Sequence, residues 1–310
     1  MKELENTLIL EQKRSILNGS IISVIIPVFN EERGIKNVVE KLQEILINSN
    51  LNFEIIIVDD GSTDRSIEVI EHISGIKFVK HSKNIGYGGA LKTGIKRAKG
   101  DIIIITDGDG TYPNEMIPEL TRYLDEYDMV VGARAMTSKN ISLIRKPMKW
   151  ILGKLANYLA ETEIPDLNSG LRAFRKDVAL QFFHMYPSGF SFTTTITLAM
   201  HCNDYDVKYI PIQYGKREGK SKIKPIRDTL NFIQLIWRTV MYFNPLKIFL
   251  PVSIFLFFCF IASFVYDVVV LDNLAQKTII FFLAFIQVTL IGLLADLIEK
   301  RSPFRHLEKK

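Results

Sequence analysis

Cysteine is scarce in this chain of 310 residues, and several common signals are missing altogether. The two cysteines, Cys202 and Cys259, stand far apart, and Cys259 lies in an apolar stretch. This excludes a disulfide framework or a cysteine metal site as the organising feature. The first twenty residues hold no apolar core of signal-peptide length, so we expect the main domain to stay in the cytosol. The chain also lacks internal repeats and low-complexity segments.

Charge is absent from two C-terminal stretches, 248–266 and 278–295. Each is about long enough to cross a ~30 Å hydrocarbon core at ~1.5 Å per residue. The connection between them carries Asp267, Asp272 and one base, Lys277, whereas bases gather on the outer flanks. The positive-inside rule therefore predicts an integral membrane hairpin with both termini cytosolic. The alternative is a buried pair of core helices. The flanking bases are Lys247, Lys300, Arg301, Arg305, Lys309 and Lys310.

The net charge of +5 is modest, but positive charge gathers just before the hairpin. Within residues 216–245, polar and basic side chains recur at helical spacing opposite an apolar face that includes Trp237. A basic amphipathic helix of this kind is typical of the membrane headgroup region. A core-packing surface helix is the alternative. We predict the membrane as a partner, and no nucleic acid.

The first half of the chain alternates apolar, β-branched runs with amphipathic stretches. Strands are predicted at 21–28, 54–58, 77–80, 102–105 and 129–132, with helices between them. This order predicts an α/β fold with a mostly parallel sheet. The chain then divides into a lead-in over 1–20, an α/β domain over 21–215, a basic juxtamembrane segment over 216–245, two transmembrane helices over 246–298 and a basic tail over 299–310.

Carboxylates follow three of these predicted strands. Glu31 follows the first, Asp59 and Asp60 the second, and Asp107 and Asp109 the fourth. In extended backbone, residues two apart point to the same side, so Asp107 and Asp109 are expected to face one point beyond the strand. Ligands bind at that edge of open α/β sheets. Two carboxylates there suit Mg²⁺ or Mn²⁺, although a polar turn is the simpler alternative.

Six motifs, in order, give the chain a family resemblance. It resembles the family-2 inverting glycosyltransferases with the Rossmann-like GT-A fold, over about residues 21–230. The last three motifs narrow this to the dolichol-phosphate mannose synthase branch, which includes polyprenyl-phosphate glycosyltransferases. The motifs are Val-Ile-Ile-Pro-Val-Phe-Asn-Glu (24–31), Ile-Val-Asp-Asp-Gly-Ser-Thr-Asp (57–64), Asp-Gly-Asp (107–109), Val-Gly-Ala-Arg (131–134), Asn-Ser-Gly-Leu-Arg-Ala-Phe-Arg (168–175) and Arg-Glu-Gly-Lys-Ser-Lys (217–222).

The resemblance implies a nucleotide-sugar donor, a polyprenyl-phosphate acceptor and a divalent metal. Asp107 and Asp109 would bind the ion and the diphosphate, with Thr111 standing where close relatives often carry a Gln ligand. Arg134 and Arg145 fall where the relatives keep arginines near the phosphates, and Arg217 and Lys222 lie on a loop expected to close over the site. The donor site would comprise Pro27, Phe29, Glu31, Val58, Asp60, Asp107, Gly108 and Asp109. The glycine-rich turn at Gly86, Gly88 and Gly89 is expected to shape the sugar pocket.

Physical chemistry supports these roles. A nucleoside diphosphate leaves only when its charge is neutralised, which a divalent ion and arginines achieve. An acceptor phosphate is already an anion, so it needs no strong base. A polysaccharide or glycolipid synthase with a hydroxyl acceptor, which would need one, is an alternative, as is a noncatalytic nucleotide-sugar-binding protein. UDP-glucose, UDP-N-acetylglucosamine and GDP-mannose all remain open, as do dolichyl and undecaprenyl acceptors and a homo-oligomer.

Overall fold

A computed structural model describes residues 19–134, 153–154, 156–158, 160–189, 191–215, 241–242, 244–271 and 273–300. The chain divides into two compact units, Met1–Phe232 and Ile233–Lys310, and each is described by itself. Three of the predicted site residues, Arg145, Arg217 and Lys222, lie outside the described residues. So do most of the lead-in, the predicted interfacial helix and most of the C-terminal tail.

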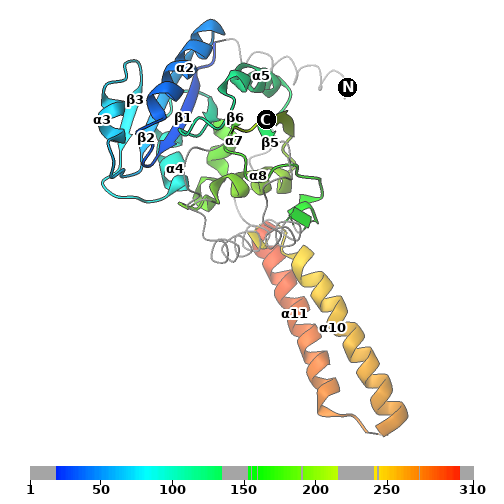
Figure 1. Cartoon of the computed structure of the whole chain (residues 1–310). Helices are drawn as coiled ribbons and strands as arrows, with labels where there is room; N and C mark the ends of the chain where they lie inside the picture. The colour runs from blue at the N-terminus through cyan, green and yellow to red at the C-terminus, as the bar shows by residue number, and fades with distance from the viewer. Residues whose placement is uncertain are drawn as a thin grey trace, which may run out of the picture. The chain divides into compact units, whose positions relative to one another are not determined.

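In the described part of the first unit, one seven-stranded sheet has the order β3-β2-β1-β4-β6-β5-β7 (Figure 1). Its strands are β1 Ile22–Val28, β2 Phe53–Asp59, β3 Lys77–Lys80, β4 Ile102–Ile105, β5 Met129–Arg134, β6 Arg172–Arg175 and β7 Val207–Ile212. Its helices are α2 Ile35–Asn48, α3 Ser66–Glu71, α4 Tyr87–Arg97, α5 Ile117–Arg122, α7 Lys176–Gln181 and α8 Phe192–Cys202. Short 3₁₀ turns are η1 Asn114–Met116, η2 Tyr123–Asp125 and η4 Phe183–Met185.

The sheet is mostly parallel, as the alternation of strands and helices predicts. β1 pairs in parallel with β2 on one side and β4 on the other, while β2 pairs in parallel with β3. Only β6 runs against its neighbours, because it pairs antiparallel with both β4 and β5. The strand order changes direction between β1 and β4, and such a switch point opens a crevice at the carboxyl ends of the strands.

The core explains why the strands read as continuous apolar runs. Ile26 of β1 belongs to a buried cluster that also holds Ile35 and Leu42 of α2. On the opposite face, Ile25 meets Gly94 of α4, where an added Cβ would clash with the Ile25 side chain. Both faces of β1 are therefore covered by helices, and each buried isoleucine contributes roughly 1.5–3 kcal/mol.

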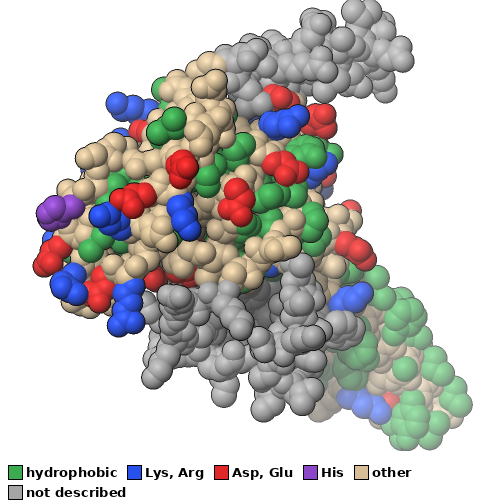
Figure 2. All heavy atoms as spheres, turned by 45° about the horizontal axis from the view of Figure 1, so that its top comes forward, with side chains coloured by type: hydrophobic (Ala, Val, Ile, Leu, Met, Phe, Trp, Pro, Cys, Tyr) green, Lys and Arg blue, Asp and Glu red, His purple; other side chains and the backbone are tan. Residues whose placement is uncertain are grey.

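The second unit is a pair of long apolar helices. α10 Leu246–Tyr266 continues as the π-helical turn η5 Asp267–Leu271, and α11 Gln276–Lys300 follows. Mean hydropathy reaches 2.6 and 2.5 in their most apolar windows, of which only 6% and 11% are buried by protein. A core helix of a soluble protein would be mostly covered, so this exposure favours membrane-spanning helices. Figure 2 shows green side chains dominating this unit, with acids and bases interspersed over the other.

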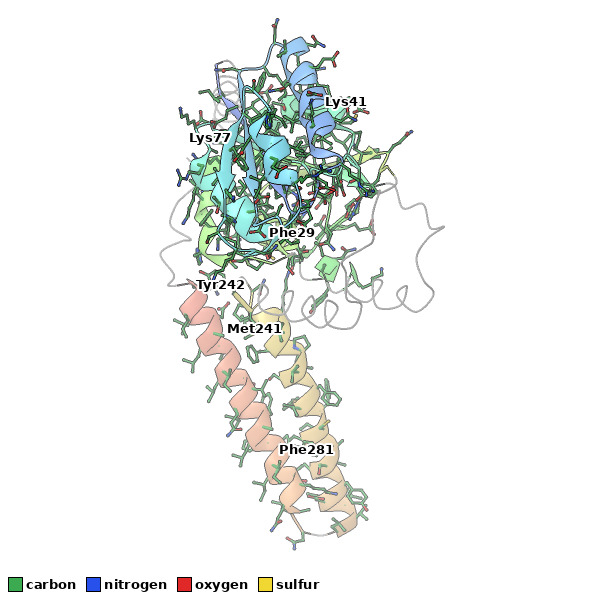
Figure 3. All side chains as sticks on the ribbon, turned by 60° about the vertical axis from the view of Figure 1, so that its left-hand side comes forward. Phe29, Lys41, Lys77, Met241, Tyr242 and Phe281 are labelled. Carbon is green, nitrogen blue, oxygen red and sulfur yellow. The ribbon has the colours of Figure 1, made fainter. Side chains whose placement is uncertain are left out.

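Contacts between α10 and α11 are close and mainly aromatic. The Phe257 and Phe285 rings lie 5.2 Å apart between centroids, and those of Phe260 and Phe282 lie 5.1 Å apart. Ser253 and Thr289 share a hydrogen bond of 2.5 Å, a common way to join helices in a bilayer. Figure 3 shows predominantly carbon along both helices. The predicted hairpin is thus matched by two packed helices, α10 beginning two residues before its uncharged stretch and α11 extending beyond its stretch at both ends.

Candidate active site

The loops that follow β1 and β2 are tied together by hydrogen bonds. The backbone N–H of Asn30 donates to Ser62 Oγ at 2.9 Å, and that of Glu31 donates to Ser66 Oγ at 2.8 Å. Asn30 has a φ of 57°, a left-handed conformation that asparagine tolerates better than most residues. Because β2, β1 and β4 are neighbours, the three predicted groups of acids do follow adjacent strands.

Asp60 is almost fully buried, with 3% of its surface exposed. Its Oδ1 accepts hydrogen bonds from the Ile85 backbone N–H at 3.0 Å and lies 2.9 Å from His81 Nδ1. Its Oδ2 accepts from the Gly86 backbone N–H at 2.8 Å. The carboxylate predicted to hold the nucleotide therefore also fixes the turn that leads into α4. Neighbouring Asp59 accepts from the backbone N–H groups of Gly61 and Ser62, both at 3.1 Å.

The acid pair lies in the turn that follows β4. Gly108 and Asp109 are in the turn itself, and Gly110 has a φ of +70°. The pair is therefore not set by extended backbone, contrary to our expectation from the strand pattern. Thr111 holds Asp109 locally, because its hydroxyl donates to Asp109 Oδ1 at 2.6 Å and its backbone N–H donates at 3.1 Å. A Cβ at Gly108 would lie 3.1 Å from Ile35 Cδ1, so a larger residue here would require the Ile35 side chain to shift.

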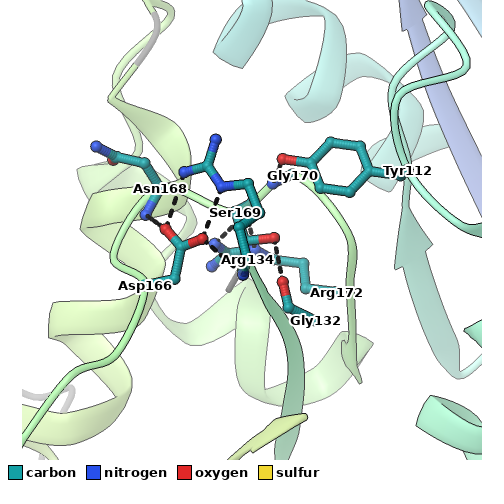
Figure 4. Close-up of polar contacts among 8 residues, drawn as sticks. All are labelled: Tyr112, Gly132, Arg134, Asp166, Asn168, Ser169, Gly170 and Arg172. Carbon is teal, nitrogen blue, oxygen red and sulfur yellow. Dashed lines mark hydrogen bonds and ion pairs between the residues drawn. The ribbon is translucent and has the colours of Figure 1, made fainter. Parts of the chain in front are cut away.

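Asp107 is held by groups from distant parts of the chain. The Tyr87 hydroxyl donates to Asp107 Oδ1 at 3.0 Å. A Cβ added to Gly170 would lie 3.0 Å from both carboxylate oxygens, so the loop before β6 passes directly over the acid. That loop is anchored by the Gly170 backbone N–H, which donates to the Tyr112 hydroxyl at 2.7 Å (Figure 4).

Arg134, at the end of β5, has its guanidinium held in place by Asp166. Nε donates to Asp166 Oδ2 at 2.7 Å and Nη2 donates to Oδ1 at 2.9 Å, a bidentate arrangement (Figure 4). The Arg134 guanidinium carbon also lies 5.3 Å from the centroid of the Tyr214 ring, whose edge meets Tyr112 at a centroid distance of 5.0 Å. Arg134 and the acid pair are thus joined through one cluster of tyrosines and one loop.

The ion pair between Arg134 and Asp166 shifts the pKa values of both groups. Burial alone would raise the pKa of Asp166, but the hydrogen bonds and charge of Arg134 lower it on balance. Burial likewise acts to lower the pKa of Arg134, and the Asp166 carboxylate outweighs this and raises it. Both groups therefore stay charged across the physiological range. An acid with a lowered pKa is a weak base, so this carboxylate suits orientation of the arginine rather than proton abstraction.

Arg172 is a second arginine near the site, and it is fully buried. Its guanidinium donates to the Ser169 carbonyl, to the Thr193 carbonyl at 3.0 Å and to Thr197 Oγ1 at 3.0 Å. Burial lowers the pKa of Arg172. These bonds fasten the loop over Asp107 to α8. The same loop is fastened again by Asn168, whose Oδ1 accepts a 2.5 Å hydrogen bond from Thr194.

The remaining predicted donor-site residues lie along the ends of β1 and β2. Pro27 and Val58 are register partners in adjacent strands, and Val58 is fully buried. Phe29 and Glu31 are partly exposed just beyond β1, and Figure 3 labels Phe29. The glycine-rich segment at Gly86, Gly88 and Gly89 also contacts the loop before α8. The N–H groups of Gly88 and Gly89 donate to the carbonyls of Gly189 and Ser188, at 3.1 and 2.8 Å.

Sequence reasoning did not single out several residues of this cluster. Asp166, Tyr87 and Tyr112 were not among the predicted site residues, and Gly170 and Arg172 entered only within a motif. A carboxylate two positions before Asn168 was the one available signal for Asp166, and it is weak because aspartate is common in loops.

Comparison with known proteins shows the family of the chain. The match to the family described as Glycosyl transferase family 2 covers residues 23–183, which is more than half of the chain. The chain belongs to glycosyltransferase family 2. A second match, to the GtrB C-terminal hairpin, covers residues 244–300 and coincides with α10 and α11.

Two curated relatives carry sugar-transferase names. The dolichol-phosphate mannosyltransferase of Pyrococcus furiosus is 28% identical over 235 residues, which cover 71% of this chain and 64% of that protein. The undecaprenyl-phosphate 4-deoxy-4-formamido-L-arabinose transferase of Pectobacterium carotovorum is 30% identical over 201 residues, which cover 63% and 61%. The chain thus spans less than two thirds of the length of these relatives.

A likeness to solved structures supports the fold. Glucosyl-3-phosphoglycerate synthase from Mycobacterium tuberculosis, solved with Mn²⁺, UDP-glucose and phosphoglyceric acid, has a TM-score of 0.56 and 19% identity. The alignment covers 74% of this chain and 83% of that one. Another structure of that synthase holds Mg²⁺ and UDP, with a TM-score of 0.55 and 19% identity over 74% and 83% of the two chains. This likeness confirms the predicted GT-A fold.

Proposed function

We propose that this protein is a membrane-bound inverting glycosyltransferase that moves a sugar from a nucleotide-sugar donor to a polyprenyl phosphate. One observation carries the proposal. An acid pair at the carboxyl end of β4 and an oriented arginine at the end of β5 are joined through Gly170, Tyr112 and Tyr214. The chain that holds them continues into two long apolar helices. The names of the two curated relatives support the polyprenyl-phosphate acceptor.

The residues of the acid pair fit a divalent cation. Asp107 and Asp109 supply hard oxygen ligands, which Mg²⁺ and Mn²⁺ prefer. The described part of the chain holds no group of three His, Cys, Asp or Glu side chains placed to bind a metal. A site with two carboxylates, completed by donor phosphates and water, is ordinary for Mg²⁺. The Thr111 hydroxyl donates a hydrogen bond to Asp109, and a metal contact through its oxygen stays a prediction.

When bound, the ion would offset the charge of the diphosphate leaving group. The chain's own contribution is positioning and charge. Arg134 presents a guanidinium whose orientation Asp166 fixes, and a planar fork suits phosphate. We propose that Arg145, Arg217 and Lys222 add further cations to this site. Donor binding by Pro27, Phe29, Glu31, Val58, Asp60 and Gly108 is part of the same proposal.

The acceptor phosphate is an anion that attacks without help from a base. A single displacement would invert the anomeric configuration, so an α-linked donor would give a β-linked lipid phosphate sugar. We propose that the reaction takes place on the cytosolic side, because the outer flanks of the hairpin carry the bases. The cationic flank also attracts anionic headgroups, at about 1 kcal/mol for each Lys or Arg near the surface.

The test uses the full-length protein reconstituted in vesicles with labelled UDP-glucose, UDP-N-acetylglucosamine and GDP-mannose. Each donor is offered with a polyprenyl phosphate and, in parallel, with the neutral polyprenol of the same length. We expect transfer from one donor to the phosphate alone, with a β-linked product by NMR. Equal transfer to the neutral polyprenol, retention of the α configuration, or no transfer from any donor would reject the proposal.

A further inference from the structure

Tyr87 is the first residue of α4, and its hydroxyl contacts an acid twenty positions further along the chain. The donor is the tyrosine hydroxyl and the acceptor is Asp107 Oδ1, at 3.0 Å. A tyrosine hydroxyl carries its proton at physiological pH, so it is the donor in this hydrogen bond to the carboxylate.

The backbone on either side of Tyr87 is fixed in place. Before it, the N–H groups of Ile85 and Gly86 donate to the carboxylate of Asp60. After it, the N–H groups of Gly88 and Gly89 donate to carbonyls of the loop before α8. Gly86 has a φ of +100°, and a Cβ there would lie 2.5 Å from the Ser188 carbonyl oxygen. The backbone on both sides of Tyr87 is thus held by hydrogen bonds, which restricts where its side chain can lie.

The two acids differ in how they are held. Asp109 accepts hydrogen bonds from the hydroxyl and the backbone N–H of Thr111, only two residues away, so these bonds are local to the turn after β4. Asp107 accepts a hydrogen bond from Tyr87 at the start of α4. A Cβ added to Gly170 would lie 3.0 Å from both of its carboxylate oxygens. Losing the tyrosine hydroxyl would remove this long-range hydrogen bond from the Asp107 carboxylate, while the bonds from Thr111 to Asp109 would remain.

We propose that Tyr87 is a positioning residue for the divalent cation site, acting through Asp107. The inference rests on the proposed metal role of the acid pair. Groups that orient a metal ligand through hydrogen bonds typically change metal affinity by about 10- to 100-fold when they are removed. The structure assigns this role to a residue outside the Asp-Gly-Asp motif, at the start of α4.

The experiment measures Mn²⁺ binding by electron paramagnetic resonance on the full-length protein in detergent, with UDP and, separately, with GDP. Four proteins are compared: wild type, Tyr87→Phe, Asp107→Ala and Tyr186→Phe. Tyr186 is the matched control, because its hydroxyl is buried with no hydrogen-bond partner among the described residues. Its removal therefore takes away a buried hydroxyl without touching Asp107. Thermal unfolding of each protein is followed alongside.

We expect Tyr87→Phe to weaken Mn²⁺ binding by at least tenfold, with an unfolding temperature close to that of Tyr186→Phe. Excess Mn²⁺ should restore most of its turnover, whereas Asp107→Ala should not recover. If Asp107→Ala binds Mn²⁺ like wild type, the metal proposal itself fails. If Asp107→Ala loses Mn²⁺ and Tyr87→Phe does not, the metal proposal stands and the inference about Tyr87 is wrong. A higher donor KM at unchanged Mn²⁺ affinity would overturn it too.

Discussion

Arg134 and Asp166 form a bidentate ion pair, with N–H···O distances of 2.7 and 2.9 Å, in which the carboxylate is the less exposed partner at 10% against 32%. The Arg134 backbone N–H also donates to Asp166 Oδ2 at 3.1 Å. Three bonds between two residues leave the guanidinium little freedom of orientation. An arginine so constrained is ready to meet phosphate without first being ordered.

We predict that Asp166→Asn lowers turnover by about a hundredfold, because a displaced guanidinium no longer meets the phosphate. Folding should persist, since asparagine has the same shape and still accepts one hydrogen bond. Steady-state transfer assays check the rate, and circular dichroism checks the fold. Asp177→Asn is the control: its pair with Arg175 is exposed and lies outside the cluster, so its turnover should match wild type. Equal activity of the two variants would contradict the orienting role.

The same pair predicts a dependence of stability on pH. The pKa of Asp166 in the folded protein lies below its ordinary value of 3.8. Its contribution to stability is therefore fully present above about pH 4 and is lost as the pH falls through the folded value. Wild type should unfold at a higher temperature than Asp166→Asn at neutral pH, and the gap should narrow towards about pH 3. A gap that widens on acidification would show that the sign is wrong.

The strands of the first half could be predicted because their cause is local. Ile102–Ile105 is a run of four isoleucines, and Lys77–Lys80 holds Phe78 and Val79 between two lysines. Both strands appear as predicted. The later strands β6 and β7 were not predicted. β6 begins with Arg172, and an arginine predicts an exposed position rather than a buried strand. Its burial depends on carbonyls of α8 and of its own loop, which no local pattern reveals.

The site divides in the same way. Asp107 and Asp109 stand in one short motif after a predicted strand, so the sequence points to them. Asp166 and Tyr87 reach the site because β6 inserts antiparallel between β4 and β5 and because the loop before α8 accepts hydrogen bonds from the first turn of α4. These contacts are long-range and depend on the fold, so the spacing of residues along the chain does not predict them.

Gly170→Ala should disable the site by displacing Asp107. The new Cβ would lie 3.0 Å from both carboxylate oxygens and 3.1 Å from Tyr112 Cε2, closer than ordinary contact allows. We expect turnover to fall at least about tenfold, and stability to fall by about 1–3 kcal/mol through overpacking. Gly189→Ala is the matched control, since nothing lies within 4 Å of a Cβ there. Transfer assays and thermal unfolding of both variants decide; similar losses in the two would argue against the steric explanation.

Asp107→Ala and Asp109→Ala should each abolish transfer while leaving the fold intact. Each substitution removes a carboxylate proposed to bind the divalent ion, so the charge of the leaving diphosphate is no longer offset. The acids are in a turn rather than in the core, and their loss should not unfold the sheet. Turnover is measured with and without EDTA, followed by added Mg²⁺. Near-normal turnover in either variant, or full activity of wild type after chelation, would remove the metal from the mechanism.

The orientation of the hairpin is the last prediction. The connection between α10 and α11 includes Asn273, whereas the basic tail includes Lys309. The base-rich flanks predict that the tail is cytosolic and that the connection faces outward. A cysteine is placed at each position in a background lacking Cys202 and Cys259, and intact cells are treated with a membrane-impermeant maleimide. We expect Asn273→Cys to be labelled and Lys309→Cys to react only after the cells are opened. Labelling in the opposite pattern would place the active site on the outer face, where cytosolic nucleotide sugars are not available to it.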